Sequence, residues 1–396
     1  MLAAIDARLE SSFGRERLQR LHRATVGVIG AGLLGGQILH HLAMLQIRTV
    51  LVEPGEVDLP NLGNQMLPAD AVGDPKSGAR VQQMHQLNPS CAVRAVATRV
   101  EDVGLGVFAD CDVLLTGLDG RGSRLAVNRI AQLLGLDWID AAVDGSGARL
   151  FGTVTWFRPH AHDGPCYGCH IDGPRLAAIA AEEGGVGCAS WRSAALRDTP
   201  PTLMASPFGA VVAGHQMAWA IQALLSEGED LVGRQLQIAG SGVPRIRSVE
   251  LPRGQRCAFP HRRLGSLRRV GSRTLGDLLE VATEDLGAAP DALVFPGRSL
   301  AHGLVCPVCG ATRELVKRRE AVRDEEVRCG CGTAHEMTPR ALVDRLDTDD
   351  ARRLGGLSWS ALGLPSEDLV TARASGREDV HYLLPMDRKE ETCRTK

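Results

Sequence analysis

The first part of the chain alternates short apolar runs with longer stretches in which apolar residues recur at helical spacing. The apolar runs occupy residues 26–29, 49–53, 92–96, 113–116 and 138–141, and the helical stretches occupy 33–45, 76–87 and 122–134. Runs this short and this apolar are typical of buried parallel strands. The alternation predicts an α/β fold with a Rossmann-like, doubly wound and mostly parallel sheet that carries helices on both faces.

The pattern changes on either side of this region. Residues 13–24 form a basic amphipathic stretch that predicts a helix, residues 151–157 alternate like an added antiparallel strand, and residues 208–225 form an alanine-rich apolar helix that we expect to be buried. A basic run rich in glycine and serine opens residues 261–290, which we expect to be a linker. The chain is therefore expected to divide into a large domain over 1–260 and a small C-terminal domain over 291–396.

Composition and charge narrow the class of protein. The 396 residues are 44% hydrophobic and 23% charged, which is typical of a globular protein with a sizeable core. The 45 basic and 47 acidic side chains give a net charge of −2, whereas a nucleic-acid-binding surface concentrates basic residues. No apolar run reaches the roughly 18 residues of a membrane span, and no signal peptide is recognisable. We therefore expect a cytoplasmic protein that binds neither nucleic acid nor a membrane.

A glycine-rich turn follows the first predicted strand. Gly30, Gly32 and Gly35 have the spacing that lets a backbone approach a phosphate at the start of a helix. Glu53 ends the second strand, where a carboxylate can accept hydrogen bonds from ribose hydroxyls. By itself this pattern indicates an NAD- or FAD-dependent oxidoreductase, or only a tight turn in a Rossmann-type sheet.

Three further motifs change that interpretation. They read Asn61-Leu62-Gly63-Asn64-Gln65, then Gly73-Asp74-Pro75-Lys76, then Leu118-Asp119-Gly120-Arg121-Gly122-Ser123-Arg124. In this order and spacing the chain resembles, over about residues 13–225, the ThiF/MoeB and ubiquitin-activating enzyme (E1-like) superfamily. The resemblance implies an ATP-binding adenylation domain over 1–260, with a crossover loop at about 170–205 above its active site, in a protein that forms a homodimer.

The resemblance also implies roles for the matching residues. Lys76 would bring positive charge to the phosphates of ATP, and Asp119 would hold Mg²⁺, a hard cation that prefers carboxylate oxygen. Arg124 would orient Asp119 or contact the C-terminus of the substrate. The other positions would fix the nucleotide by neutral hydrogen bonds: Asn61, Gln65 and Asn128. An NAD-dependent oxidoreductase would leave Lys76 and Asp119 without roles.

One position departs from the family pattern. Asn64 stands where the family usually has an arginine that contacts the triphosphate. An asparagine cannot supply that charge. We therefore expect either that another basic residue substitutes at the nucleotide site or that ATP binds more weakly. Family dimers also lend an N-terminal arginine across their interface, a role that Arg8 or Arg15 would take here.

The 11 cysteines fall largely into close groups, which in a reducing compartment indicate metal ligands rather than disulfides. The first pair, Cys166 and Cys169, matches the family's first zinc knuckle. Where the family has a second Cys-x-x-Cys, this chain reads Cys-Ala-Phe-Pro-His. The resemblance therefore implies one structural Zn²⁺ site that comprises Cys166, Cys169, Cys257 and His261. Two glycine-bearing knuckles in the C-terminal domain have the pattern of a zinc ribbon, with Cys306, Cys309, Cys329 and Cys331 as ligands.

Cys188 has no such partner in the sequence. It lies in Gly184-Gly185-Val186-Gly187-Cys188-Ala189, inside the expected crossover loop. Family members that pass a ubiquitin-like protein onward carry their acceptor cysteine in this loop. Cys188 is therefore predicted to attack the acyl-adenylate as a thiolate and form a thioester. The alternative is an ordinary loop cysteine in an enzyme that stops at adenylation.

The predicted function is ATP-dependent adenylation of the C-terminal glycine of a ubiquitin-like or sulfur-carrier protein, followed by thioester formation on Cys188 for transfer to a conjugating or carrier enzyme. The cofactors would be ATP, Mg²⁺ and Zn²⁺. Two alternatives share parts of the same sequence. One is adenylation of the C-terminus of a ribosomal peptide without cysteine transfer, and the other is an inactive zinc-containing scaffold, which Asn64 alone favours.

Overall fold

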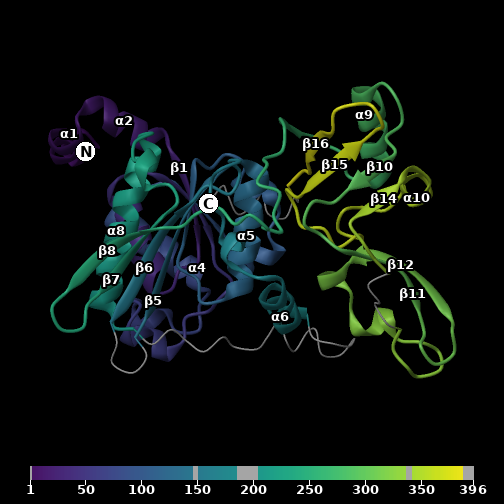
Figure 1. Ribbon diagram of the computed structural model, residues 1–396, viewed down its shortest axis with the longest axis horizontal. Coiled ribbons are helices and arrows are strands. Elements are labelled where there is room, and N and C mark those ends of the chain that lie inside the picture. Colours follow the sequence, from purple (N-terminus) through teal and green to yellow (C-terminus); the bar gives the residue numbers. More distant parts are fainter. Residues whose placement is uncertain (1, 146–149, 185–203, 336–340, 387–396) are drawn as a thin grey trace. The chain divides into compact units, whose positions relative to one another are not determined.

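The computed structural model describes residues 2–145, 150–184, 204–335 and 341–386 (Figure 1). Within these ranges the chain divides into two compact units. The first unit is formed largely by residues before 264 and the second largely by residues after it, although residues 102–107 and 174–184 belong to the second unit. A search of the helices in these ranges finds none with the length and apolarity that a membrane span requires.

An eight-stranded sheet forms the centre of the first unit, in the order β3-β2-β1-β4-β5-β6-β7-β8. The parallel strands coincide with the predicted apolar runs: β1 (Thr25–Ile29), β2 (Arg48–Val52), β3 (Val93–Val96), β4 (Val113–Thr116) and β5 (Asp137–Asp144). Antiparallel strands extend the sheet at one edge: β6 (Phe151–Phe157), β7 (Arg234–Ala239) and β8 (Arg245–Glu250). The predicted α/β fold with a mostly parallel sheet is confirmed.

Helices cover both faces of this sheet, with α5 (Arg121–Leu134) and α8 (Ser206–Leu224) on opposite sides (Figure 1). The other α-helices of this unit are α1 (Leu2–Phe13), α2 (Arg15–Arg23), α3 (Leu33–Met44) and α4 (Lys76–Leu87), whereas α6 (Gly173–Gly184) falls, apart from Gly173, in the second unit. Short 3-10 turns are η1 (Leu59–Gly63), η2 (Ala69–Ala71), η3 (Val100–Asp102), η4 (Leu105–Phe108), η6 (Tyr167–His170) and η7 (Glu229–Leu231). The helix predicted over 13–24 is α2, separated from α1 by Gly14 at a φ of 79°.

Burial explains why the central strands are parallel. Four successive residues are buried in each of β1, β2 and β4, as expected for strands covered on both faces. These strands share one apolar core with α3 and α8. Gln216 of α8 is fully buried and donates to the carbonyl oxygens of Thr116 (2.9 Å) and Ile139 (2.8 Å), which ties α8 to β4 and β5.

The second unit contains two smaller sheets. The five-stranded sheet has the order β14-β10-β15-β16-β9, with β9 (Leu267–Arg269), β10 (Ala292–Val294), β14 (Arg345–Asp347), β15 (Leu369–Arg373) and β16 (Val380–Leu383). Its helices are α9 (Leu275–Leu286) and α10 (Thr348–Arg353). The three-stranded sheet has the order β12-β11-β13, with β11 (Leu300–Val305), β12 (Thr312–Arg318) and β13 (Leu342–Val343). The 3-10 turns η8 (Arg319–Ala321) and η9 (Asp324–Val327) lie between β12 and β13 along the chain.

The segment expected to be a linker, 261–290, is folded in the structure. It contains β9 and α9, and the apolar face of α9 lies in the core of the second unit. Thr274 caps α9: its hydroxyl accepts from the backbone N–H of Asp277 at 3.1 Å, and the Asp277 carboxylate accepts from Thr274 N at 3.0 Å. The basic residues before this capping box obscured it in the sequence. The cysteine-bearing three-stranded sheet lies between β10 and β14 along the chain.

Candidate functional site

A cavity of about 740 Å³ lies at the carboxyl ends of β1 and β4. This is the edge of an open α/β sheet at which ligands bind, and the volume is sufficient for a nucleotide. Its walls come from the glycine-rich turn, the η1 region, the residues after β4, the end of β5 and the residues before α8. The predicted site residues that line the cavity are Gly32, Asn61, Asn64, Gln65, Asp119 and Arg124.

The glycine-rich turn meets the cavity at Gly32, and its shape depends on Gly30 and Gly35. Gly30 has a φ of 89°, and a Cβ atom on Gly35 would overlap with the Gly30 carbonyl oxygen, so both positions require glycine. Gly32 is the N-cap of α3 and has no side chain to bond the first N–H groups of that helix. Such a helix start offers backbone donors and a positive dipole end to an anion.

Glu53 lies behind this turn rather than in the cavity wall. It is 7% exposed, and its two carboxylate oxygens accept from Ala31 N at 2.6 Å and from Gly55 N at 2.7 Å. The ammonium of Lys76 lies close to Gly55: a Cβ atom placed on Gly55 would be 3.5 Å from Lys76 Nζ. Neither Glu53 nor Lys76 lines the cavity, and their contacts with ribose and phosphate stay predictions.

Arg124 reaches the cavity from α5 and forms a buried ion pair with Asp140 on β5. Its Nε donates to Asp140 Oδ2 at 3.0 Å and Oδ1 at 3.3 Å, and Asp140 Oδ1 also accepts from Thr116 Oγ1 at 2.5 Å. Burial lowers the pKa of Arg124, but the neighbouring Asp140, together with Tyr167 and Asp119, raises it overall, so the guanidinium stays charged. The sequence analysis missed Asp140, because only pairing of β4 with β5 brings it to Arg124.

Asn128 lies behind the cavity, on the side of the cysteine knuckle. It is fully buried on α5, and its Oδ1 accepts from the backbone N–H of Tyr167 at 2.9 Å. Tyr167 begins η6, the turn that carries Cys169, and Asn128 does not line the cavity. The structure therefore gives Asn128 a contact with the cysteine knuckle, and its contact with the nucleotide stays a prediction.

Arg80 is a second residue that the sequence analysis missed. It lies on α4, is 1% exposed, and donates to the backbone carbonyl oxygens of Ala31 (3.1 Å), Gly32 (3.3 Å) and Gln65 (2.6 Å). Its contacts join the glycine-rich turn to the segment that follows η1. The one available signal was its position four residues after Lys76, on the same face of one helix.

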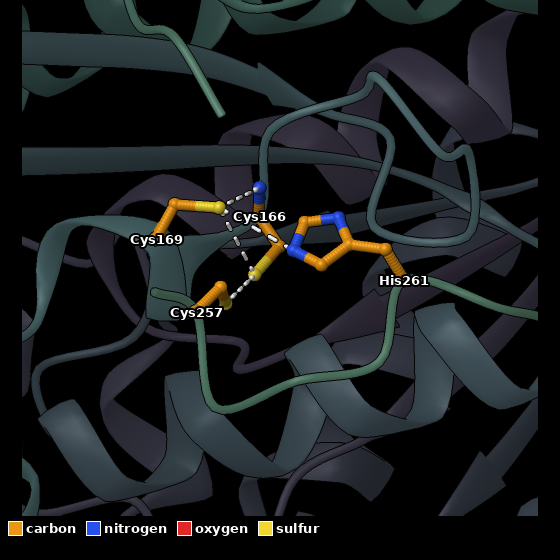
Figure 2. A group of neighbouring side chains, drawn as sticks. All are labelled: Cys166, Cys169, Cys257 and His261. Atoms are coloured by element: carbon orange, nitrogen blue, oxygen red, sulfur yellow. Dashed lines mark hydrogen bonds between the residues drawn. The ribbon is translucent and has the colours of Figure 1, made fainter. Parts of the chain in front are cut away.

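The first cysteine group comes together as predicted from distant parts of the first unit. Figure 2 shows the four side chains pointing toward one another, two from the knuckle and two from residues 257–261. The Sγ atoms of Cys166 and Cys257 are 3.5 Å apart, and Cys169 Sγ lies 3.7 Å from Cys166 Sγ and 3.4 Å from His261 Nε2. Thiolates bound to one tetrahedral Zn²⁺ at about 2.3 Å lie about 3.8 Å apart, so these residues fit the ion.

Electrostatics and backbone conformation support this fit. The hydrogen bond with Cys166 lowers the pKa of Cys169 to about 4, so this sulfur is a thiolate at neutral pH, which is the form that binds Zn²⁺. His261 is 4% exposed and has a φ of 49°, an unfavourable conformation for a residue with a side chain. Strain of this kind persists where the surrounding structure requires it.

The second cysteine group forms at the tips of the three-stranded sheet. Cys306 Sγ lies 3.6 Å from Cys331 Sγ, and Cys309 Sγ lies 3.5 Å from Cys329 Sγ. The four sulfur atoms are all within 4.8 Å of one another, which again fits a tetrahedral Zn²⁺ site. Cys188, the predicted nucleophile, lies outside the described residues.

The ThiF family matches residues 6–258. The sulfur carrier protein adenylyltransferase of Thermus thermophilus is 30% identical over 62% of this chain and 84% of its own length, and the SAMP-activating enzyme E1 of Haloferax volcanii is 31% identical over 56% and 75%. A crystal structure of E. coli MccB with succinimide aligns with a TM-score of 0.49 and 18% identity over 64% of this chain and 74% of that one. The chain belongs to the ThiF family.

Proposed function

We propose that this protein uses ATP to adenylate the C-terminal glycine of a ubiquitin-like or sulfur-carrier protein. One observation carries the proposal: the uncapped start of α3, Asp119 and Arg124 all line the same cavity. A helix start suits phosphate, a carboxylate suits Mg²⁺, and a guanidinium suits the carboxylate of an acyl substrate. The names of the Thermus and Haloferax relatives, an adenylyltransferase and an activating enzyme, agree with this class of reaction.

The reaction assigns a role to each of these groups. A carboxylate oxygen of the substrate attacks the α-phosphorus of ATP, the bond to the β-phosphate oxygen breaks, and pyrophosphate leaves. The N–H groups at the start of α3 and the Lys76 ammonium stabilise the negative charge that develops on the phosphates. Asp119 holds Mg²⁺, which when bound neutralises phosphate charge. Arg124, fixed by Asp140, positions the attacking carboxylate.

A second step on Cys188 completes the proposed reaction. The thiolate attacks the carbonyl carbon of the acyl-adenylate, AMP leaves, and the substrate is held as a thioester for transfer to a partner enzyme.

The two zinc sites are closed sets of four ligands, which makes them structural. The protein would act in the cytoplasm as a homodimer. The second unit, in which Cys309 and Cys331 are exposed, would dock the partner enzyme.

Pyrophosphate exchange tests the first step. Labelled pyrophosphate should enter ATP only when Mg²⁺ and a carrier ending in glycine are both present. Asp119→Asn should lower the exchange rate by about 100-fold or more, because it removes the metal-binding charge. Asp70→Asn, a change of the same kind at an exposed residue of η2, should leave it unchanged. Equal exchange in the wild type and Asp119→Asn would contradict the assigned role, and exchange with a glycine-free peptide instead would support the peptide-adenylating alternative.

Intact-mass measurement tests the second step. After incubation with Mg²⁺, ATP and the carrier, the wild type should carry an adduct that an added thiol removes by thioester exchange, and Cys188→Ala should carry none. Cys393→Ala is the matched control, since it removes a thiol without ligand spacing. An adenylated carrier that forms equally in Cys188→Ala, with no adduct in the wild type, would show that the enzyme stops at adenylation. No nucleotide binding at all would support the inactive scaffold.

A further inference from the structure

Arg80 fixes the orientation of the backbone on two sides of the cavity. Its guanidinium donates to the carbonyl oxygens of Ala31, Gly32 and Gln65, and its Nη1 donates to Gln83 Oε1 at 2.8 Å. In a trans peptide the C=O of one residue and the N–H of the next point in opposite directions. The N–H groups of Gly32 and Leu33 therefore point away from Arg80, and both residues line the cavity.

Glu53 and Arg80 hold the same residue from two sides. Glu53 accepts from Ala31 N, while Arg80 donates to Ala31 O. Burial lowers the pKa of Arg80 to about 10, a loss that the Glu53 carboxylate partly offsets, so the guanidinium is charged at neutral pH. A hydrogen bond to a carbonyl oxygen polarises the whole peptide group and strengthens its N–H as a donor. The turn is thus held in one conformation beside a fixed positive charge.

We propose that Arg80 is a positioning residue of the nucleotide site. It presents the N–H groups of the glycine-rich turn to the phosphates of ATP and supplies from behind the turn the positive charge that Asn64 lacks. Its own N–H groups are bonded to protein oxygens, so it acts on the phosphates through the backbone and through its field rather than by contact. The assignment rests on the proposed function, because it takes ATP as the ligand.

Gly36 provides the space that this arrangement requires. A Cβ atom there would overlap with the Arg80 guanidinium, whose atoms are the three nearest to it. Gly36 lies inside α3, where glycine is otherwise less favourable than alanine. The substitution Gly36→Ala should therefore displace Arg80 while favouring the helix, which makes it a second way to move the guanidinium without removing it.

Nucleotide affinity measured by calorimetry tests the proposal. Arg80→Met should weaken ATP binding by about tenfold or more, the scale of one charge-assisted hydrogen bond, and should change adenosine binding by less than about twofold. Arg80→Lys keeps the charge without the planar fork and should fall between the wild type and Arg80→Met. The matched control is Arg17→Met, which removes a half-exposed arginine paired with Glu227 and should leave both affinities unchanged.

The ratio of ATP to adenosine affinity separates positioning from general loss of structure. A structural role alone would weaken both ligands equally, and unchanged ATP affinity in Arg80→Met would also overturn the proposal. If Arg80→Met does not fold, Gly36→Ala decides the matter: it should weaken ATP but not adenosine, and an unchanged ratio would overturn the proposal. A wild-type chain that fails to bind ATP would overturn the proposed function together with this inference, whereas ATP binding with an unchanged ratio in the variants would overturn this inference alone.

Discussion

The buried ion pair between Arg124 and Asp140 predicts a large effect for one conservative substitution, Asp140→Asn. The two side chains are 10% and 9% exposed. Asparagine has nearly the same shape and can still accept from Thr116, but it leaves the Arg124 guanidinium without its counter-charge. Breaking a buried pair in this way costs about 3–5 kcal/mol, because an uncompensated charge stays in a medium of low polarity. We expect Asp140→Asn to lower the free energy of unfolding of the first unit by that amount.

Urea unfolding followed by tryptophan fluorescence measures this loss. Trp138 reports on the cluster directly, because its Nε1 donates to Thr116 Oγ1 at 2.8 Å. The matched control is Glu227→Gln, which breaks a surface pair whose side chains are 42% and 47% exposed and should cost at most about 1 kcal/mol. Adding Arg124→Met to Asp140→Asn should recover part of the stability, since it removes the unpaired charge.

Two results would refute this reasoning. One is a loss in Asp140→Asn no larger than that in Glu227→Gln, which would mean that water reaches the pair. The other is a further loss, rather than a recovery, when Arg124→Met is added. Either result must be accompanied by an unchanged slope of free energy against urea, because a changed slope indicates a different denatured state.

Three further outcomes follow from the structure. The protein should bind two zinc ions per chain, one in each cysteine group. Elemental mass spectrometry should find one ion fewer in Cys257→Ser and in Cys309→Ser, and a variant that keeps both ions would contradict the assigned ligands. Hydrogen bonds from the backbone N–H of Arg273 and from Thr274 lower the pKa of Asp277, so its contribution to stability is present above a pH of about 4 and is lost as the pH falls through its lowered pKa. The melting temperature of the second unit should therefore fall less steeply with decreasing pH in Asp277→Asn than in the wild type. Equal slopes of melting temperature against pH in the two proteins would exclude this. Arg298→Met should lower the free energy of unfolding of the second unit by about 3–5 kcal/mol, because it strands the fully buried Asp368 carboxylate, and thermal melting without a shift would contradict it.

Most of the fold was predictable because its signals are local. The runs at 26–29 and 113–116 are apolar throughout, and they form β1 and β4 in the interior of a parallel sheet. The helix predicted over 76–87 has those same bounds in the structure. Local signals failed in the segment 261–290, where a basic stretch concealed β9 and the capped helix α9. Neither element is stable alone, and both are held by the core of the second unit.

In the candidate site, too, local spacing predicts some features and leaves others to the packing of the elements. Gly30, Gly32 and Gly35 lie within one turn, so their spacing is sufficient to predict a phosphate-binding backbone. Asn128 lies on the predicted helix, yet its side chain turns to Tyr167, 39 residues away, and the helix pattern does not say which neighbour each face meets. Spacing alone predicts that a residue belongs to a helix, whereas its contacts depend on how that helix packs.

The sequence by itself determined the parallel strands of the first unit, the glycine-rich turn and the paired spacing within each cysteine knuckle, because each depends on residues a few positions apart. The family of the chain followed from several such motifs in order. Only the tertiary structure decided that Arg80 contacts Ala31, 49 residues away, and that Arg124 pairs with Asp140. A charged side chain is buried only where partners from other elements compensate its loss of water. Those partners are set by sheet order and helix packing, so the buried charges around the site could not be read from the order of residues along the chain.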